Sequence, residues 1–303
     1  MANNSTITLL ESEEWIKRFV YNQKLSIGSY KEPLISSANQ ILQTILGKPF
    51  RWPFNRVVTG FVAVAGTQDY SLGAWAASTA FAKNFNIIDS NGNAQKVTTA
   101  GTSGATAPSW NATTGGTTAD GTRTLVWTNQ GSIPHASPSF TYGWIENASV
   151  QDPTTSKWTQ VSNKVDLALD SSSARPMHIS AELDSGTGSL IFRLMPVPDK
   201  AYPVAITLQQ GAPLFTSLNQ TWSPIPDNLS YVYQKGLLAE MFEFADDPRS
   251  IGSRQKFIAS LLGAAEGLTA TEINIFLNQW QAISGSPLEK QIQLQQGNQA
   301  RGV

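Results

Sequence analysis

From Arg51 to Leu72 the chain reads RWPFNRVVTGFVAVAGTQDYSL, and the spacing of its apolar residues changes within this stretch. Before it, apolar residues recur every three or four positions; after it, they alternate. Pro49 and Pro53 prevent a helix from running through the junction, because proline lacks an amide hydrogen and restricts the residue before it. The stretch therefore predicts a change from helix to strand, with a large β region inserted between helical ends.

Two helices are predicted before this junction, within residues 1–50. The apolar residues between Leu9 and Val20 fall at helical spacing. A second helix is expected from Pro33 to Leu46, because proline suits a first helical turn and Gly47 follows as a stop signal. We expect the two helices to pair as an antiparallel hairpin that forms part of a helical base.

Strands are predicted after the junction, up to about residue 222. Short segments rich in β-branched and aromatic residues alternate with turn signals such as Asn91-Gly92. We expect residues 51–97 and 139–222 to form one β-sandwich-like body, interrupted by residues 98–138.

The interruption has a composition of its own. Between Lys96 and Glu146 the only formal charges are Asp120 and Arg123, and small hydroxyl-bearing residues dominate. A low-complexity linker is one interpretation, but the tryptophans of this segment can supply a small apolar core. We therefore predict that residues 98–138 form a small all-β module inserted into a loop of the body.

Helical spacing returns after the segment Trp222-Ser-Pro-Ile-Pro226. Residues 223–285 are expected to form helices that complete the base, and Thr269 and Glu272 have the spacing of a capping box. Residues 286–303 are rich in glutamine, and we expect them to form an extended C-terminal arm. The predicted fold class is α+β, with a helical base, a β body and an inserted β module.

Composition limits the classes of function. The net charge is −1 and charged residues make up 14% of the chain, below the roughly 25% of typical soluble domains. We therefore expect no broad face for nucleic acid. The absence of cysteine excludes disulfides and thiolate metal sites. With no signal-peptide pattern and no long apolar run, we expect a soluble product made in the cytoplasm without export.

Motifs for catalysis are missing from the sequence. His135 and His178 are isolated, and no HExxH, GxSxG or GxxxxGK[ST] pattern occurs. The carboxylates of the β region form no recognisable pair for glycoside hydrolysis. We therefore expect no catalytic residue, no metal, no cofactor and no enzymatic activity, although composition alone leaves a Ser–His–Asp triad open.

The tryptophans suggest a different class of function, because sugars stack on exposed aromatic faces. Trp110 and Trp127 in the inserted module are the candidates for a glycan or surface contact. The alternative is that they pack the module's own core. Four other residues are expected to be structural, at the two junctions between helix and strand: Trp52, Pro53, Trp222 and Pro226.

The order of these elements resembles the head-to-tail adaptor (connector) proteins of short-tailed, podovirus-type bacteriophages. The resemblance is carried by Arg51-Trp-Pro-Phe54 and by the pattern Gly66-x-x-x-Tyr70-x-Leu72. Later motifs that fit it are Ile191-Phe-Arg-Leu-Met-Pro196, Trp222-x-Pro-Ile-Pro226-x-x-Leu229, Gly236-Leu-Leu-Ala239 and Asp246-Asp-Pro-Arg249. The insert looks like small β modules of phage virion proteins in its residues Gly101-x-Ser-Gly104, Pro108-x-Trp110, Asp120-Gly121 and Trp127.

The resemblance implies a structural protein of the virion, located at the head–tail interface and assembled in the host cytoplasm. Its expected form is a homo-oligomeric, dodecameric ring below the portal protein and above a tail or nozzle protein. Double-stranded DNA would pass transiently through the ring, and no membrane partner is expected. The residues expected to bind the portal or a neighbouring subunit are Leu288, Ile292, Leu294 and Arg301. Two alternatives remain open: a tail-decoration or glycan-binding protein, and a cell-wall hydrolase.

Overall fold

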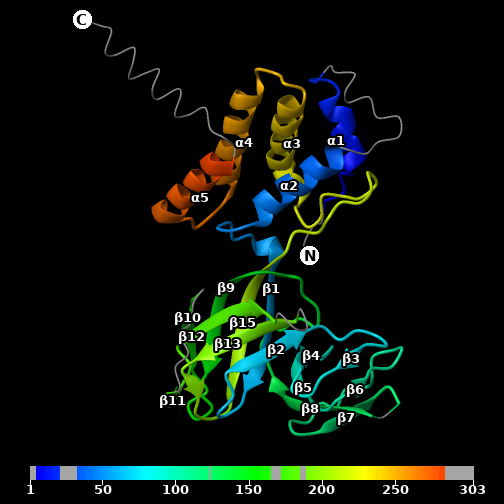
Figure 1. Cartoon of the computed structure of the whole chain (residues 1–303), viewed down its shortest axis with the longest axis vertical. Helices are drawn as coiled ribbons and strands as arrows, with labels where there is room; N and C mark the ends of the chain where they lie inside the picture. Colours follow the sequence, from blue (N-terminus) through cyan, green and yellow to red (C-terminus); the bar gives the residue numbers. More distant parts are fainter. Residues whose placement is uncertain (1–4, 21–32, 123, 165–171, 185–188, 284–303) are drawn as a thin grey trace, which may run out of the picture. The chain divides into compact units, whose positions relative to one another are not determined.

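The chain has an α+β fold that divides into two compact units (Figure 1). The computed structural model describes residues 5–20, 33–122, 124–164, 172–184 and 189–283. One unit comprises residues 1–55 and 212–303 and contains the helices; the other comprises residues 56–211 and contains the strands. We call them the helical unit and the β unit. The predicted α+β class is therefore confirmed.

The boundaries of the units lie at 55/56 and 211/212, whereas the predicted positions were 50/51 and 222/223. The reason is packing. Trp52 and Phe50 on one side, and Phe215 and Trp222 on the other, are buried in the helical core. The aromatic residues at the two predicted junctions therefore belong to the helical unit.

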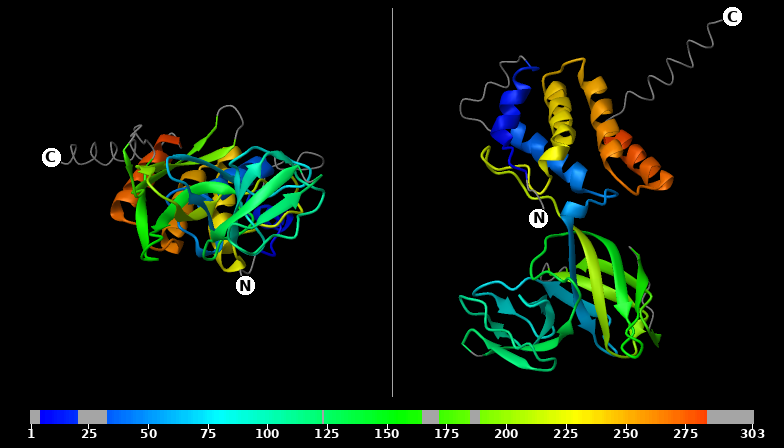
Figure 2. Two further views of the ribbon diagram at one scale, coloured as in Figure 1. Left: turned by 90° about the horizontal axis from the view of Figure 1, so that it is seen from below. Right: turned by 180° about the vertical axis from the view of Figure 1, so that it is seen from behind.

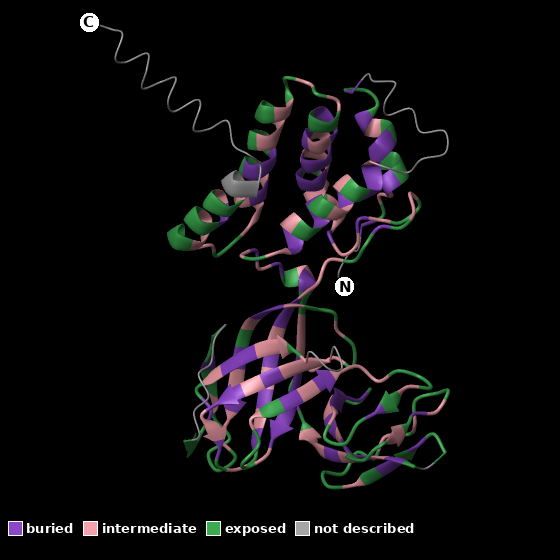
Figure 3. Cartoon of the chain, viewed as in Figure 1, coloured by how far each residue is buried: buried purple, intermediate pink, exposed green. Residues whose placement is uncertain are grey.

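In its described residues, the helical unit consists of α-helices and two short 3-10 helices. They are α1 (Leu9–Ile16), α2 (Leu34–Leu46), η2 (Pro53–Asn55), η3 (Asp227–Leu229), α3 (Ser230–Phe244), α4 (Ser250–Ala264) and α5 (Ala270–Ile283). The expected hairpin of the two N-terminal helices is not the main packing, because α1 and α2 each pack on α3. Their apolar faces enter one core shared with Tyr233 and Leu237 of α3, as the buried stripes in Figure 3 show.

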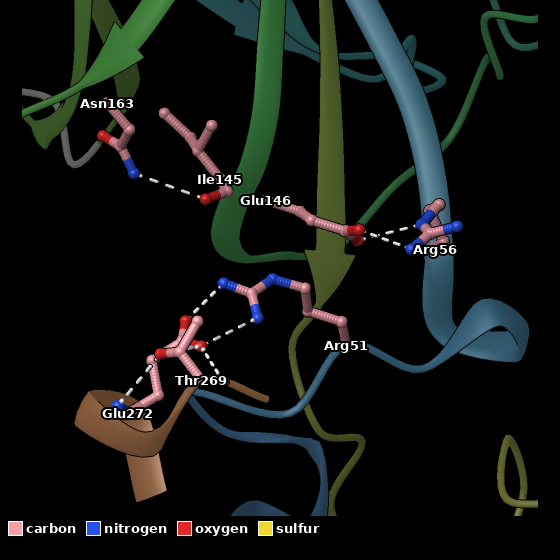
Figure 4. Close-up of polar contacts among 7 residues, drawn as sticks. All are labelled: Arg51, Arg56, Ile145, Glu146, Asn163, Thr269 and Glu272. Carbon is pink, nitrogen blue, oxygen red and sulfur yellow. Dashed lines mark hydrogen bonds and ion pairs between the residues drawn. The ribbon is translucent and has the colours of Figure 1, made fainter. Parts of the chain in front are cut away.

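Helix α5 is fixed to this unit at its N-terminus. Thr269 donates from its amide and hydroxyl to Glu272 Oε2 at 3.0 and 2.9 Å, and the Glu272 amide donates to Thr269 Oγ1 at 3.2 Å. The predicted capping box is therefore confirmed. Arg51 forms a two-pronged ion pair with the same carboxylate (Figure 4), and Phe276 packs edge-on against Phe50 at 4.9 Å.

We expect Glu272→Gln to lower the free energy of unfolding at neutral pH by about 1–2 kcal/mol, because it removes a charged cap and an ion pair. The hydrogen bond from Arg51, followed by those of Thr269, lowers the pKa of Glu272 to about 2. A depressed pKa stabilises the fold above the unfolded value of about 4.3, and this contribution is lost as the pH falls towards 2.

Urea unfolding at several pH values, with circular dichroism at a helical wavelength, measures this difference. Glu266→Gln, at an exposed position of the same unit, is the control. A Glu272→Gln deficit that persisted undiminished at pH 2 would contradict the assigned role of the carboxylate.

The described part of the β unit contains one mixed sheet of eleven strands and two two-stranded sheets. The strands are β1 (Arg56–Ala63), β2 (Asp69–Gly73), β3 (Ala80–Phe81), β4 (Asn86–Ile88), β5 (Asn93–Thr99), β6 (Gly101–Thr102), β7 (Thr117–Asp120), β8 (Leu125–Ser132), β9 (Tyr142–Gln151), β10 (Trp158–Asn163), β11 (Ser173–Ala174), β12 (His178–Leu183), β13 (Leu190–Met195), β14 (Val197–Pro198) and β15 (Tyr202–Gln210). The large sheet has the order β1-β15-β9-β10-β12-β13-β2-β4-β5-β8-β7. It curls, since β1 also contacts β2, β4 and β5.

The turn that joins β1 to β2 is fixed by one tyrosine. Tyr70 stacks on Phe61 at 4.4 Å, and its hydroxyl accepts from the Val64 amide at 3.0 Å and donates to the Thr67 carbonyl at 2.6 Å. Burial raises the pKa of Tyr70 to about 12. Gly66 takes the positive φ of 75° that this turn needs, a value that costs glycine little.

The small β module begins earlier than the predicted residue 98. That position lies inside β5, which pairs with β8. Its core combines Leu125 and Trp127 with Phe81, Ile87 and Val97. Figures 1 and 2 show β3 to β8 grouped on one side of the β unit. The residues after Lys96 include few charged side chains, but this change of composition is not a structural boundary. The strands before and after it are hydrogen-bonded to one another and form one module.

Candidate functional site

A buried carboxylate organises the small β module. Asp120, at the end of β7, is 3% exposed. It accepts from Trp75 Nε1 at 2.8 Å, Trp127 Nε1 at 3.1 Å, the Gly104 amide at 2.9 Å and the Gly121 amide at 2.7 Å. Burial by itself raises the pKa of Asp120, but these four hydrogen bonds outweigh it and lower the pKa below its usual value. The group is saturated with donors, which suits a structural role.

The two candidate glycan contacts have different environments. Trp127 has no exposed surface, so its ring cannot stack on a sugar; it packs the module's own core, which was the alternative interpretation. Trp110 is partly buried and lies edge-on to Trp127, with ring centroids 5.8 Å apart. Only Trp110 of this pair retains ring surface for an external contact.

The four junction residues lie in the helical unit. Trp52 donates from Nε1 to the Ile45 carbonyl at 2.6 Å, and Pro53 opens the short helix η2. Trp222 is fully buried and stacks on Tyr233 at 4.3 Å with an interplanar angle of 6°. Pro226 precedes η3. No chemistry is associated with these residues, and they serve packing.

The N-terminal segment is paired with the residues before Trp222. Thr8 and Thr221 form an antiparallel bridge, flanked by hydrogen bonds from the Leu9 amide to the Gln220 carbonyl at 3.0 Å and from the Trp222 amide to the Ile7 carbonyl at 3.1 Å. Earlier in this segment, Ser5 and Thr6 donate to the carboxylate of Asp227. The two segments of the chain that make up the helical unit are thereby joined.

A groove of about 430 Å³ lies next to this bridge. Its lining is uncharged, and consists of Leu42, Pro213, Leu214, Phe215, Asn219, Gln220, Thr221 and Ser223. Leu214 is 58% exposed, whereas Leu42 and Phe215 are buried. This groove was not predicted from the sequence, although the apolar run Pro213-Leu-Phe215 is a signal that could have indicated it.

The walls of the groove are fixed by two amide side chains. Asn39 of α2 donates from Nδ2 to the Phe215 carbonyl at 3.1 Å and accepts from the Phe215 amide at 2.6 Å. Gln220 Oε1 accepts from the amides of Thr216 and Ser217 at 2.6 and 2.8 Å. The groove is therefore formed in advance of any ligand.

A metal-binding cluster is not found among the residues that the structure describes. No group of three or more His, Asp or Glu residues there is placed to hold a metal ion. His135 is exposed in a loop with φ of 60°, and His178 begins β12 with a buried Nδ1 that lacks a hydrogen-bond partner within the described part. The two histidines are thus in unrelated settings.

Comparison with known proteins gives no assignment, because the sequence matches no protein-family model and no curated protein. Within the described ranges, no helix combines the length and apolarity needed to cross a membrane. The predicted contact residues Leu288, Ile292, Leu294 and Arg301, and the arm 286–303 that carries them, lie outside the described residues.

Proposed function

We propose that this chain is a structural virion protein, a head-to-tail adaptor that forms a ring between the portal and the tail and extends the DNA channel. The observation that carries the proposal is the architecture. Helices from both ends of the chain make one unit, and a β unit is inserted between Asn55 and Ala212. This arrangement fits the order of elements in the adaptors that the sequence resembles.

Further support comes from the surface chemistry. A chain with 14% charged residues and a net charge of −1 is rich in uncharged polar groups, which cost less to desolvate than charges when subunits pack closely. A heterologous interface that closes on itself generates a ring. A channel without strong positive patches lets DNA pass, because tight phosphate contacts would retain it.

In finer detail, we infer that the helical unit is the base that faces the portal. The β unit is then a β-sandwich-like body with an inserted module, directed towards the tail. The protein acts without catalysis, metal or cofactor in this role. Its partners are further copies of itself, the portal protein, a tail or nozzle protein and the DNA in transit.

One observation favours a second candidate. The partly exposed ring of Trp110 is compatible with a decoration or carbohydrate-binding role for the small module. A hydrolase has no comparable support, because the groove of about 430 Å³ has no carboxylate in its lining.

Reconstitution with the portal protein of the same phage tests the proposal. Mixed with purified portal, the chain is expected to form a ring on the portal that electron microscopy resolves. The matched control is a portal of an unrelated phage, which is expected to remain bare. If no complex forms and Trp110→Ala abolishes binding to a glycan array, the carbohydrate role replaces the adaptor.

A further inference from the structure

The strand-like segment beside the groove has one free edge. In the antiparallel bridge between Thr8 and Thr221, the flanking hydrogen bonds involve the carbonyl of Gln220 and the amide of Trp222. In this pattern the bridged residue directs its own amide and carbonyl to the opposite side. Among the described residues, neither of these two Thr221 groups has a hydrogen-bond partner.

The free edge and the groove belong to the same place, since Thr221 lines the groove. An extended peptide can add a strand to such an edge through main-chain hydrogen bonds, while neighbouring pockets accept alternate side chains. Pro213 and Leu214 supply the exposed part of an apolar wall, to which Leu42 and Phe215, both almost fully buried, also contribute. The volume of about 430 Å³ lies within the range of about 300–1,000 Å³ typical of ligand sites.

A segment of this chain has the chemistry that such a groove requires. Residues 288–295 read LEKQIQLQ, and no charge occurs from Gln291 to Ala300. Ile292 and Leu294 are two positions apart, so in an extended peptide both side chains point to one face and the glutamines point to the other. An uncharged groove with amide and hydroxyl groups at its rim matches the uncharged part of this segment, residues 291–295, because binding of that part desolvates no charge.

We propose that residues 291–295 of a second copy bind in this groove as an added strand alongside Thr221. Ile292 and Leu294 enter the apolar wall, and the glutamine side chains meet the rim at Asn219 and Gln220. The inference rests on the proposed ring for the choice of a second copy. It names the surface through which neighbouring subunits are linked.

The absence of cysteine in the sequence makes disulfide trapping in the full-length chain a direct test. One variant carries Asn219→Cys in the groove and the other carries Gln293→Cys between the two aliphatic residues. Mixed under mild oxidation, they are expected to give a crosslinked dimer at least roughly tenfold faster than the control pair, because the bound segment raises the effective concentration. In the control pair, Gln160→Cys at an exposed amide on β10 replaces Asn219→Cys.

Matched pairs of charges test the orientation of the segment. Ile292→Asp with Leu294→Asp is expected to reduce the crosslinking rate to that of the control. Gln291→Asp with Gln295→Asp adds the same charge on the opposite face of an extended segment and is expected to retain most of the rate. Equal loss in both pairs would overturn the proposed orientation and the strand-like binding with it.

Two outcomes overturn the proposal itself. One is a crosslinking rate at Asn219 no greater than at Gln160, and the other is a product confined to single chains that carry both Asn219→Cys and Gln293→Cys. Portal binding is measured separately. Crosslinked dimers without a ring on the portal would support binding of the segment in the groove and contradict the adaptor function. Rings without crosslinks would support the adaptor function and contradict binding in the groove.

Discussion

Asp120→Ala is expected to destabilise the β unit by about 4 kcal/mol, because the buried Trp127 indole and three less buried donors lose their common acceptor, and a buried unsatisfied group costs about 1–3 kcal/mol. The donors are the indoles of Trp75 and Trp127 and the amides of Gly104 and Gly121. Unfolding in urea, followed by tryptophan fluorescence, measures the loss. Hydrogen exchange of β5, β7 and β8 is expected to rise first, because these strands surround the carboxylate.

The control for this variant is Asp152→Ala. The Asp152 carboxylate accepts from the amides of Thr154 and Thr155 at 2.8 and 3.2 Å in a turn, and we expect a much smaller loss of stability than for Asp120→Ala. Asp120→Asn keeps the shape but replaces one acceptor oxygen by a donor, so an intermediate loss is expected. Equal stability of the Asp120 and Asp152 variants would contradict the central position of Asp120.

The Asp120 carboxylate also makes the stability of the small β module depend on pH in the acid range. Its pKa in the fold is lower than the usual value of about 3.9. A depressed pKa stabilises the folded state above the unfolded pKa, and this contribution is lost as the pH falls below it. The wild-type advantage over Asp120→Asn should therefore shrink below about pH 4.

Trp222→Ala is expected to destabilise the helical unit by about 3–5 kcal/mol, the usual cost of removing a large buried aromatic side chain. Trp222 is fully buried, stacks on Tyr233 and lies edge-on to Phe215 at 5.0 Å. Its Nε1 also donates to Ser12 Oγ at 2.9 Å. Helical circular dichroism during urea unfolding measures the loss.

Two controls separate packing from hydrogen bonding at this position. Trp222→Phe retains an aromatic ring against Tyr233 and removes the bond to Ser12, so we expect a loss of about 1–2 kcal/mol. Trp158→Ala on β10, where the side chain is only partly buried, should cost less than about 1 kcal/mol. A Trp222→Ala loss no larger than that of Trp158→Ala would show that the helical core does not depend on this ring.

The sequence predicted the positions of helices better than it predicted which elements pack together. The helices of residues 34–46 and 270–283 and the capping box of Thr269 follow from local spacing and side-chain chemistry, which the sequence displays directly. The hairpin of α1 and α2 and the module boundary at residue 98 depended on partners far along the chain. Such partners are chosen by tertiary packing, which local periodicity does not record.

The same contrast between local signals and contacts of distant residues applies to the candidate sites. Trp222 and Trp52 were predicted as core residues, and both are buried. Asp120 was visible only as an isolated charge, because its four donors come from residues 75, 104, 121 and 127. The groove was missed because Asn39 and Phe215, which fix its wall, are 176 positions apart.

The insertion of the β unit between Asn55 and Ala212 also has a consequence for synthesis on the ribosome. The core of the helical unit needs Trp222 and Tyr233, so it cannot close until the chain beyond them has emerged, whereas residues 56–211 are complete by then. Once folded, the β unit holds its two ends together. Arg56 of β1 pairs in register with Gln209 of β15, and both donate to Glu146 of β9. The early unit thereby removes most of the loop-closure entropy that the late unit would otherwise have to overcome.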